Sequence, residues 1–178
     1  TPVMFEDFRP YSMDIEDNNR TMSDAEYYEA TMKLTPLQRY LAVEGATEKE
    51  YGGKTTNGYK WDTQEEGVYL SSVSGVALFS SKAKYDSKTG WPSFSAPIKS
   101  DLIVERVDVQ DKLKEKPESE CRIEVLDRAS KTHLGYVIND GPESTGKRYK
   151  INAGCLKFVP TSAPEASPEE AAKGWKFK

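Results

Sequence analysis

The sequence predicts an α+β or all-β fold that is mainly β, with helices confined to its N-terminal part. From Tyr59 onward, short β-branched or aromatic runs are separated by Gly, Pro, Asn, Asp and Ser. Runs such as "VERVDV" and "IEV" alternate apolar and polar residues, as half-buried antiparallel strands do. Two helix-start patterns precede these runs, so strands are expected to form the core and helices to cover it.

Each predicted helix begins at a capping box. In "SDAE", Ser23 is the expected N-cap and Glu26 reaches back to it, which opens a short helix through "YYEATM". "TPLQ" repeats the pattern from Thr35, with a proline at the first helical position. In this second helix Leu37, Tyr40 and Leu41 share a face, and Gly45 can end it.

The predicted strands follow in order along the chain. They lie within residues 67–75, 75–81, 101–109, 121–128, 133–140 and 148–159. The stretch "RYKINAGCLKF" (148–158) is interpreted as one strand that carries one of only two cysteines. Residues 160–178 are rich in Pro, Ala and Glu and bury too little apolar surface to order alone.

Length and charge narrow the possible functions. The 178 residues suit one domain (34–159) with an N-terminal extension (1–33) and a C-terminal tail (160–178). A net charge of −4 gives no electrostatic footprint for nucleic acid. No apolar run approaches the ~18 residues that span a membrane. "TPVMFEDFRP" lacks the basic and apolar regions of a signal peptide, and two cysteines do not make a disulfide scaffold.

Four segments in order resemble the B-type methionine sulfoxide reductases, which reduce the R epimer of methionine sulfoxide. They are "LTPLQRYLAVEGATEKEYGG" (34–53), "GVYLSSVSGVALFSSKAKYDSKTGWPSF" (67–94), "HLGYVINDGP" (133–142) and "RYKINAGCLKF" (148–158). The resemblance covers about residues 34–159. It implies a small antiparallel β-barrel-like core flanked by N-terminal helices.

Two catalytic positions implied by the resemblance hold other residues. The family's nucleophilic cysteine is third in the strand that matches "RYKIN", where this chain has Lys150. A thiolate attacks the sulfoxide sulfur and becomes a sulfenic acid, and an amine has no equivalent cycle. The family's second histidine corresponds to Tyr136, and His133, the only histidine, matches the first. With a reference pKa of ~10, a tyrosine is a poor proton shuttle at neutral pH.

Neither cysteine is an obvious replacement for the missing thiol. In a regular strand Cys155 would lie about 16 Å beyond Lys150 and face the opposite side of the sheet. Cys121 is expected to begin another strand. Free cysteines usually pack as small hydrophobic residues, which favours a structural role for both. The sequence does not decide whether the two form a disulfide.

At other positions the chain keeps residues of the family's substrate pocket, and it lacks the residues of the family's zinc site. The resemblance implies a substrate-packing role for Trp91, flanking polar roles for Arg148 and Asn152, and a retained strand end at Asn139 and Asp140. Many members bind structural zinc through two Cys-x-x-Cys pairs, whose positions here hold Ser71, Ser74, Asp127 and Ser130. Serine is a poor zinc ligand, so no metal and no cofactor is predicted.

These observations favour a catalytically silent reductase-like domain that serves as a binding or structural subunit of a larger assembly. Residues 1–33 and 160–178 are expected to contact the partner protein, with Trp175 and Phe177 as anchors. The alternative is an active peptide-methionine (R)-S-oxide reductase that uses Cys155 or Cys121. A weaker alternative is a non-catalytic reader of oxidised methionine. An assembly role and a processed N-terminus would favour a chloroplast or mitochondrion over the cytosol.

Overall fold

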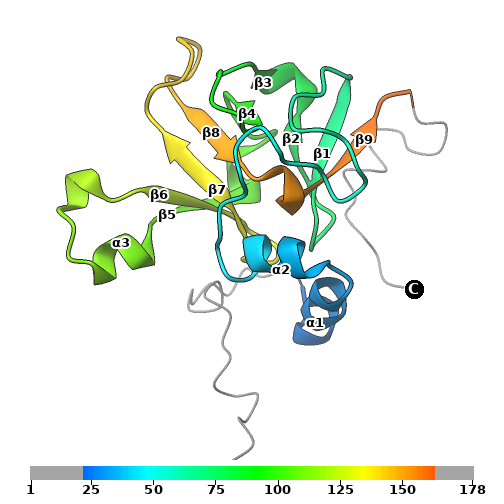
Figure 1. The fold of residues 1–178 in the computed structure, drawn as a ribbon, viewed down its shortest axis with the longest axis horizontal. Helices are drawn as coiled ribbons and strands as arrows, with labels where there is room; N and C mark the ends of the chain where they lie inside the picture. Colours follow the sequence, from blue (N-terminus) through cyan, green and yellow to red (C-terminus); the bar gives the residue numbers. More distant parts are fainter. Residues whose placement is uncertain (1–21, 163–178) are drawn as a thin grey trace, which may run out of the picture.

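The computed structural model describes residues 22–162, which form two antiparallel sheets with helices at one end (Figure 1). A three-stranded sheet has the order β2-β1-β9, and a six-stranded sheet has the order β3-β4-β8-β7-β6-β5. The predicted mainly β fold with N-terminal helices is therefore confirmed. No pairing among the described strands closes the two sheets into one barrel.

The element bounds follow the predicted strand order closely. The strands are β1 (Gly67–Ser71), β2 (Ala77–Ser80), β3 (Lys84–Tyr85), β4 (Ser93–Phe94), β5 (Ile103–Val107), β6 (Ile123–Asp127), β7 (His133–Ile138), β8 (Arg148–Ile151) and β9 (Leu156–Pro160). The helices are α1 (Asp24–Met32), α2 (Pro36–Ala42) and α3 (Val109–Leu113). Short 3₁₀ turns are η3 (Ser81–Ala83), η4 (Ser100–Leu102), η5 (Glu118–Glu120) and η6 (Ala153–Cys155).

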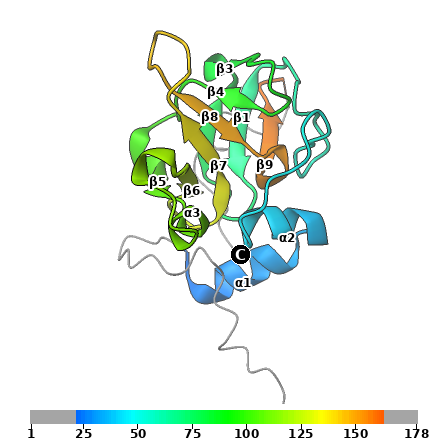
Figure 2. The same cartoon turned by 60° about the vertical axis from the view of Figure 1, so that its left-hand side comes forward.

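Both capping boxes form as predicted, because they depend only on residues three apart in the chain. The Ser23 hydroxyl accepts from the Glu26 amide at 3.2 Å, and the Glu26 carboxylate accepts from the Ser23 amide at 2.8 Å. Thr35 and Gln38 make the equivalent pair at the start of α2. The two helices lie side by side at one end of the sheets (Figures 1 and 2).

The apolar face predicted for α2 is only partly buried. Leu41 is 1% exposed, whereas Leu37 and Tyr40 are 62% and 53% exposed. The helix ends at Ala42, and Gly45 follows it in a turn with a φ of 74°. Leu41 and Ala42 therefore face the sheets, and the other two apolar side chains cover the outside of the helix.

One core joins the two sheets through a cluster of aromatic rings. Phe79 and Phe94 stack with their centroids 4.5 Å apart, and Tyr69 lies 5.1 Å from Phe94 and 4.6 Å from Phe158. All four rings are at most 1% exposed. Each such pair contributes about 0.5–1.5 kcal/mol beyond its buried area, which fixes β1, β2 and β9 against β4.

The interpretation of residues 148–158 as a single strand was wrong. The chain leaves the six-stranded sheet after Ile151, turns through η6 and enters the three-stranded sheet at Leu156. A Cβ at Gly154 would come within 2.7 Å of the Leu41 side chain, so α2 packs directly on this turn. The break places Cys155 in the turn between the sheets.

Between β5 and β6 the chain projects as a small lobe, here called the α3 lobe (residues 108–122; Figure 1). The prediction of a strand through Val109 was wrong at its end, since Asp108 is the N-cap of α3 and accepts from the Asp111 amide at 2.9 Å. Cys121 does not begin a strand, because it is the C-cap of η5 and β6 starts at Ile123.

The predicted anchors Trp175 and Phe177, and most of the N-terminal extension, lie outside the described residues. Within residues 22–162, none of the helices has the length and apolar character needed to cross a membrane.

Candidate functional site

Lys150 lies near the middle of the six-stranded sheet, since β8 is flanked by β4 and β7. Its register partners are Ser93 and Tyr136. The Lys150 Nζ is 3.9 Å from the centroid of the Trp91 ring, which is a cation–π contact. Burial lowers the pKa of Lys150, and the charge of Arg148 adds to this effect. The indole acts in the opposite direction, because it stabilises the charged ammonium.

Tyr136 joins the α3 lobe to the sheet. Its side chain is buried, and its hydroxyl donates to the Asp108 carboxylate at 3.2 Å. The Arg122 guanidinium lies 4.5 Å from the centre of the ring. Burial and the Asp108 charge raise the pKa of the Tyr136 phenol above its usual range. The phenol therefore stays protonated at neutral pH and does not act as a base.

His133 is completely buried next to Tyr136. In a regular strand residues three apart face opposite sides, but the β6–β7 register shifts between Val125 and Leu126. This bulge brings the two rings to a centroid distance of 5.3 Å. His133 Nδ1 lies 2.6 Å from one carboxylate oxygen of Glu124. The other oxygen of that carboxylate accepts from Arg106 at 2.7 Å.

The contact with Glu124 identifies which ring nitrogen of His133 donates. A carboxylate accepts, so the histidine donates from Nδ1. Nε2 is buried and has no hydrogen-bond partner among the described residues. His133 is thus oriented by Glu124, and its ring lies beside the phenol of Tyr136.

Cys155 belongs to the core of the protein. It is 1% exposed, and burial raises the pKa of its thiol above the usual range, with a further contribution from Glu48. Its backbone carbonyl accepts from Ser72 at 2.9 Å, next to the end of β1. A protonated thiol packed between α2 and the sheets is a poor nucleophile.

Cys121 lies in the α3 lobe and is half-buried. Its Sγ is 3.6 Å from the Lys116 carbonyl oxygen. Both cysteines are free thiols, so the disulfide that the sequence left open does not form.

Trp91 and Asn152 hold the loop that follows α2. The Trp91 indole N–H donates to the Glu48 carbonyl at 2.9 Å. The Asn152 side chain donates to the Ala46 carbonyl at 2.9 Å and accepts from the Glu48 amide at 3.1 Å. These contacts fix the position of Trp91 relative to β8, so both residues also serve the structure.

Arg148 makes a two-pronged salt bridge with Asp140 across the β7–β8 hairpin. The two hydrogen bonds measure 2.8 and 3.0 Å. The guanidinium holds the pKa of the Asp140 carboxyl below its usual range. Asn139, beside it, is exposed.

The four positions where the resemblance implies zinc ligands form hydrogen-bonded turns here. The Ser71 hydroxyl accepts from the amides of Val73 and Ser74, both at 3.2 Å. The Asp127 carboxylate accepts from the Ser130 hydroxyl and from the Ala129 amide. Among residues 22–162 no group of three or more His, Cys, Asp or Glu side chains is arranged to hold a metal ion.

Sequence reasoning missed Glu48, a buried residue whose backbone carbonyl accepts from the Trp91 indole. One carboxylate oxygen accepts from the Gly154 amide at 3.1 Å, and the other is buried without a partner in the described residues. Burial raises the pKa of Glu48 to about 7. The only sequence signal was its place in "ATEKEY", within the segment 34–53 that resembles the family.

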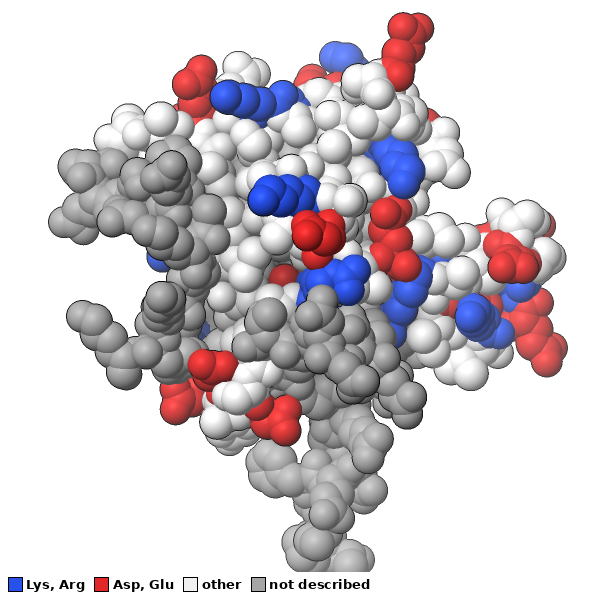
Figure 3. Space-filling view, turned by 180° about the vertical axis from the view of Figure 1, so that it is seen from behind, with Lys and Arg blue, Asp and Glu red and all other residues white. Residues whose placement is uncertain are grey.

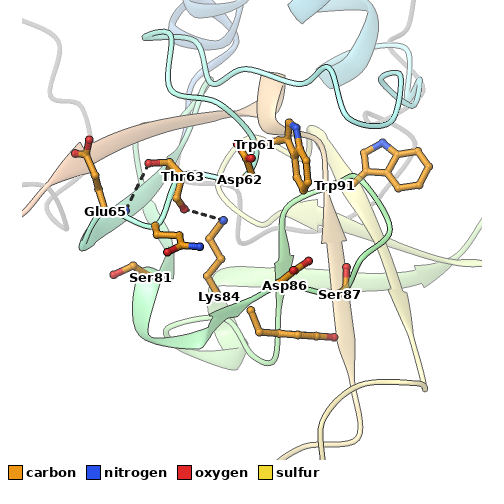
Figure 4. Close-up of a pocket in the computed structure, with 11 residues that line it drawn as sticks. Trp61, Asp62, Thr63, Glu65, Ser81, Lys84, Asp86, Ser87 and Trp91 are labelled. Carbon is orange, nitrogen blue, oxygen red and sulfur yellow. Dashed lines mark hydrogen bonds between the residues drawn. The ribbon is translucent and has the colours of Figure 1, made fainter.

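A cleft of about 370 Å³ opens beside Trp91 and is named here the two-tryptophan cleft (Figure 4). In Figure 4 the indoles of Trp61 and Trp91 lie on one side, and Lys84, Asp86 and Ser87 lie on the other. Its lining residues are Trp61, Asp62, Thr63, Gln64, Glu65, Ser81, Lys84, Tyr85, Asp86, Ser87 and Trp91. Lys150, which contacts the Trp91 ring, is not among these lining residues.

The face of the molecule seen in Figure 3 has no large patch of side chains of a single charge. Lys and Arg side chains lie among Asp and Glu side chains there. An interleaved surface of this kind gives little attraction for a polyanion.

The predicted site residues thus fall into two groups. Lys150, Tyr136 and His133 lie on the adjacent strands β8 and β7, and Trp91, in the loop before β4, contacts Lys150. Arg148 lies on the same strand as Lys150, and Asn152 follows it. Cys155 and Cys121 lie elsewhere, one in the core and one in the α3 lobe. The arrangement offers an oriented imidazole and an aromatic wall, with an amine at the centre.

Comparison with known proteins adds independent information. The family model described as "SelR domain" matches residues 34–160. The chain is also 43% identical over 143 residues to a Vibrio cholerae protein named "Peptide methionine sulfoxide reductase MsrA/MsrB". That match covers 80% of this chain and 33% of the relative, so the chain spans about a third of the length of that protein.

Proposed function

The chain belongs to the B-type methionine sulfoxide reductase family, and we propose that it has lost catalysis and serves as a binding or structural subunit of a larger assembly. The observation that carries this proposal is the position of Lys150, whose ammonium lies 3.9 Å from the Trp91 ring centre. The Lys150 side chain therefore lies against Trp91, the residue that corresponds to the family tryptophan on which the substrate methyl group packs.

The chemistry of the reduction explains why an amine there stops it. A thiolate attacks the sulfoxide sulfur, the sulfoxide oxygen leaves with the thiol as a sulfenic acid, and methionine is released. Other thiols then reduce the sulfenic acid. An ammonium has no lone pair for the first step, and an amine would not form a species that thiols reduce.

The second replacement is Tyr136, which stands where the family has its second histidine. It removes a proton donor from the position next to Lys150 in the sheet. The Tyr136 hydroxyl is bound to Asp108 and its pKa is raised, so it does not protonate the sulfoxide oxygen as an imidazolium would. Instead, Tyr136 contributes to holding the α3 lobe. Together, the two replacements support the loss of catalysis, because both side chains make packing and hydrogen-bond contacts in place of the reactive groups.

The first test is turnover of a peptide containing methionine-R-sulfoxide with dithiothreitol as reductant. We expect the wild-type chain to show no turnover above a Cys121→Ser/Cys155→Ser variant. The double variant Lys150→Cys/Tyr136→His should gain turnover, because it restores both reactive groups on the existing strands.

A matched control separates the new thiol from the removal of the lysine. Lys150→Ser/Tyr136→His opens the pocket equally but carries no thiol, and it should remain inactive. Robust turnover by the wild-type chain that disappears in Cys155→Ser would refute the proposal and establish the displaced-thiol alternative.

The assembly role is supported by the surface of α1 and α2. Seven large hydrophobic side chains are exposed in the described residues, and four lie on these two helices. They are Tyr28, Met32, Leu37 and Tyr40, each at least 52% exposed. Exposed apolar side chains gathered on neighbouring elements are typical of protein contact surfaces. The SelR match begins at residue 34, so α1 and the N-terminal extension lie outside it.

A further inference from the structure

The two-tryptophan cleft has the chemistry of a site for an organic cation. We propose that it binds the guanidinium group of an arginine side chain presented by a peptide or protein partner. The inference does not depend on the loss of catalysis, because none of the replaced catalytic residues lines the cleft.

The charge of the lining is negative. Asp62, Glu65 and Asp86 contribute three carboxylates, and Lys84 contributes one ammonium. The carboxylates of Asp62 and Glu65 have no hydrogen-bond or salt-bridge partner among the described residues. Asp86 is paired only with Lys88 at 3.8 Å, and both side chains are largely exposed, which makes that pair weak.

Lys84 does not fill the cleft as a built-in ligand. Its Nζ donates to the Thr63 carbonyl oxygen at 3.0 Å, as the dashed line in Figure 4 shows. This hydrogen bond directs the ammonium to the backbone. Burial lowers the pKa of Lys84, while the carboxylates of Asp62 and Asp86 raise it. With three carboxylates and one ammonium, the lining residues carry a net negative charge.

The aromatic wall is rigid. The Trp61 backbone amide donates to the Gly53 carbonyl at 2.9 Å, and its ring packs edge-on against Tyr51 with centroids 5.5 Å apart. Trp91 is fixed by its indole N–H bond to Glu48. A wall that is already in place loses little conformational entropy when a ligand binds.

Trp91 already shows that its indole accepts a cation, since Lys150 lies 3.9 Å from the ring centre. A cation–π contact contributes about 0.5–2 kcal/mol, and tryptophan is the strongest partner. The cleft therefore combines the two features that select organic cations, which are indole surfaces and nearby carboxylates.

Arginine fits this combination better than lysine. A guanidinium is planar, stacks on aromatic faces, and donates in pairs to carboxylates, whereas an ammonium is a compact and strongly hydrated charge. A volume of about 370 Å³ suits one extended side chain with its hydration rather than a folded element.

The test uses the full chain and short peptides. Acetyl-Gly-Arg-Gly-amide is titrated while the indole N–H signals are followed by NMR, with Trp→Phe variants to assign the three tryptophans. We expect the Trp61 and Trp91 signals to shift, with a dissociation constant on the order of millimolar for a single side chain. Citrulline in place of arginine keeps the shape without the charge and should bind at least about tenfold more weakly.

Two variants locate the site. Trp61→Leu should weaken binding of the arginine peptide about fivefold or more. Asp62→Asn should weaken it by a similar factor and reduce the salt dependence. Asp101→Asn makes the same chemical change at an exposed position outside the cleft and should bind as the wild type does.

Three outcomes would overturn the proposal. They are equal affinity for the citrulline and arginine peptides, tighter binding of a lysine peptide, or wild-type affinity in Asp62→Asn. Asp62 is exposed, so this variant tests the cleft even if Trp61→Leu fails to fold. The reductase assay is a separate measurement, so a failure here leaves the proposed loss of catalysis unaffected.

Discussion

Lys150 shows how a lysine side chain can be accommodated in a half-buried position. Desolvation and the nearby guanidinium groups lower the pKa of its amine, and the indole of Trp91 offsets part of this cost. The lysine stem also covers the strand on which it lies. Lys150 lacks the thiol that the reduction of methionine sulfoxide needs, but its side chain packs well against Trp91.

Glu48 leads to a prediction about stability and pH. Its pKa is about 7 in the folded chain and about 4.5 in a free side chain. The folded state binds this proton more tightly, so the free energy of unfolding falls as pH rises from about 4.5 to about 7 and then levels off. The contribution is on the order of 3 kcal/mol across that range. Asp111 and Asp140 have lowered pKa values and are already ionised there.

Urea unfolding at several pH values checks this expectation. Glu48→Gln should flatten the fall in unfolding free energy between pH 5 and about 7.5, because the amide does not titrate. Glu44→Gln, at an exposed position shortly before it, should keep the wild-type slope. An unchanged slope in Glu48→Gln would mean that Glu48 titrates as an ordinary surface acid.

At the scale of elements, the α3 lobe depends on one buried carboxylate. Asp111 is 0% exposed and accepts from Lys116 at 2.8 Å and from both the backbone and the side chain of Arg122 at 3.0 Å. Arg122 in turn covers Tyr136. These contacts join the α3 lobe to β7.

Removing that carboxylate should loosen the lobe without unfolding the sheets. In Asp111→Ala we expect amide hydrogen exchange in residues 109–122 to accelerate about tenfold or more, while β7 and β8 stay protected. Glu118→Ala removes an exposed acid from the same lobe and should exchange as the wild type does. Equal exchange in the two variants would contradict the role given to Asp111.

Local sequence predicted some elements and not others, for identifiable reasons. Ser23 and Thr35 begin helices because a capping box is complete within four residues. The η6 turn was missed because the packing of Gly154 against Leu41 depends on residues far apart in sequence. The α3 helix is five residues long, too short for a periodic pattern, and its N-cap Asp108 continues the alternation of the preceding strand.

The candidate site was predictable only where the family resemblance assigns a chemical role to a position. The replacements at Lys150 and Tyr136 were visible through the resemblance to the family, which implies a thiol and an imidazole at those positions. The cation–π contact of Lys150 and the burial of Glu48 were not, because both arise from folding. Trp61 gave no signal, since a single aromatic residue in a loop has many possible roles.

At the scale of the whole molecule, the exposed apolar surface of α1 and α2 predicts where a partner binds. A tagged chain isolated from its native source with its partners should lose them in Leu37→Glu/Tyr40→Glu, because two carboxylates would be buried at the contact. Leu113→Glu changes a 71% exposed leucine in the α3 lobe and should retain them. Mass spectrometry of the purified complexes provides the comparison. Retention of the same partners by both variants would exclude α2 from the contact.

The crossing of the chain at η6 has a consequence for engineering the protein. The backbone passes from one sheet to the other within a buried turn of three residues, so a tag or a cut placed there would separate the two halves of the core. The stretch 142–146 between β7 and β8 is exposed and does not connect the two sheets. A fluorophore or affinity handle inserted in that stretch should leave the architecture intact and report on the molecule from outside.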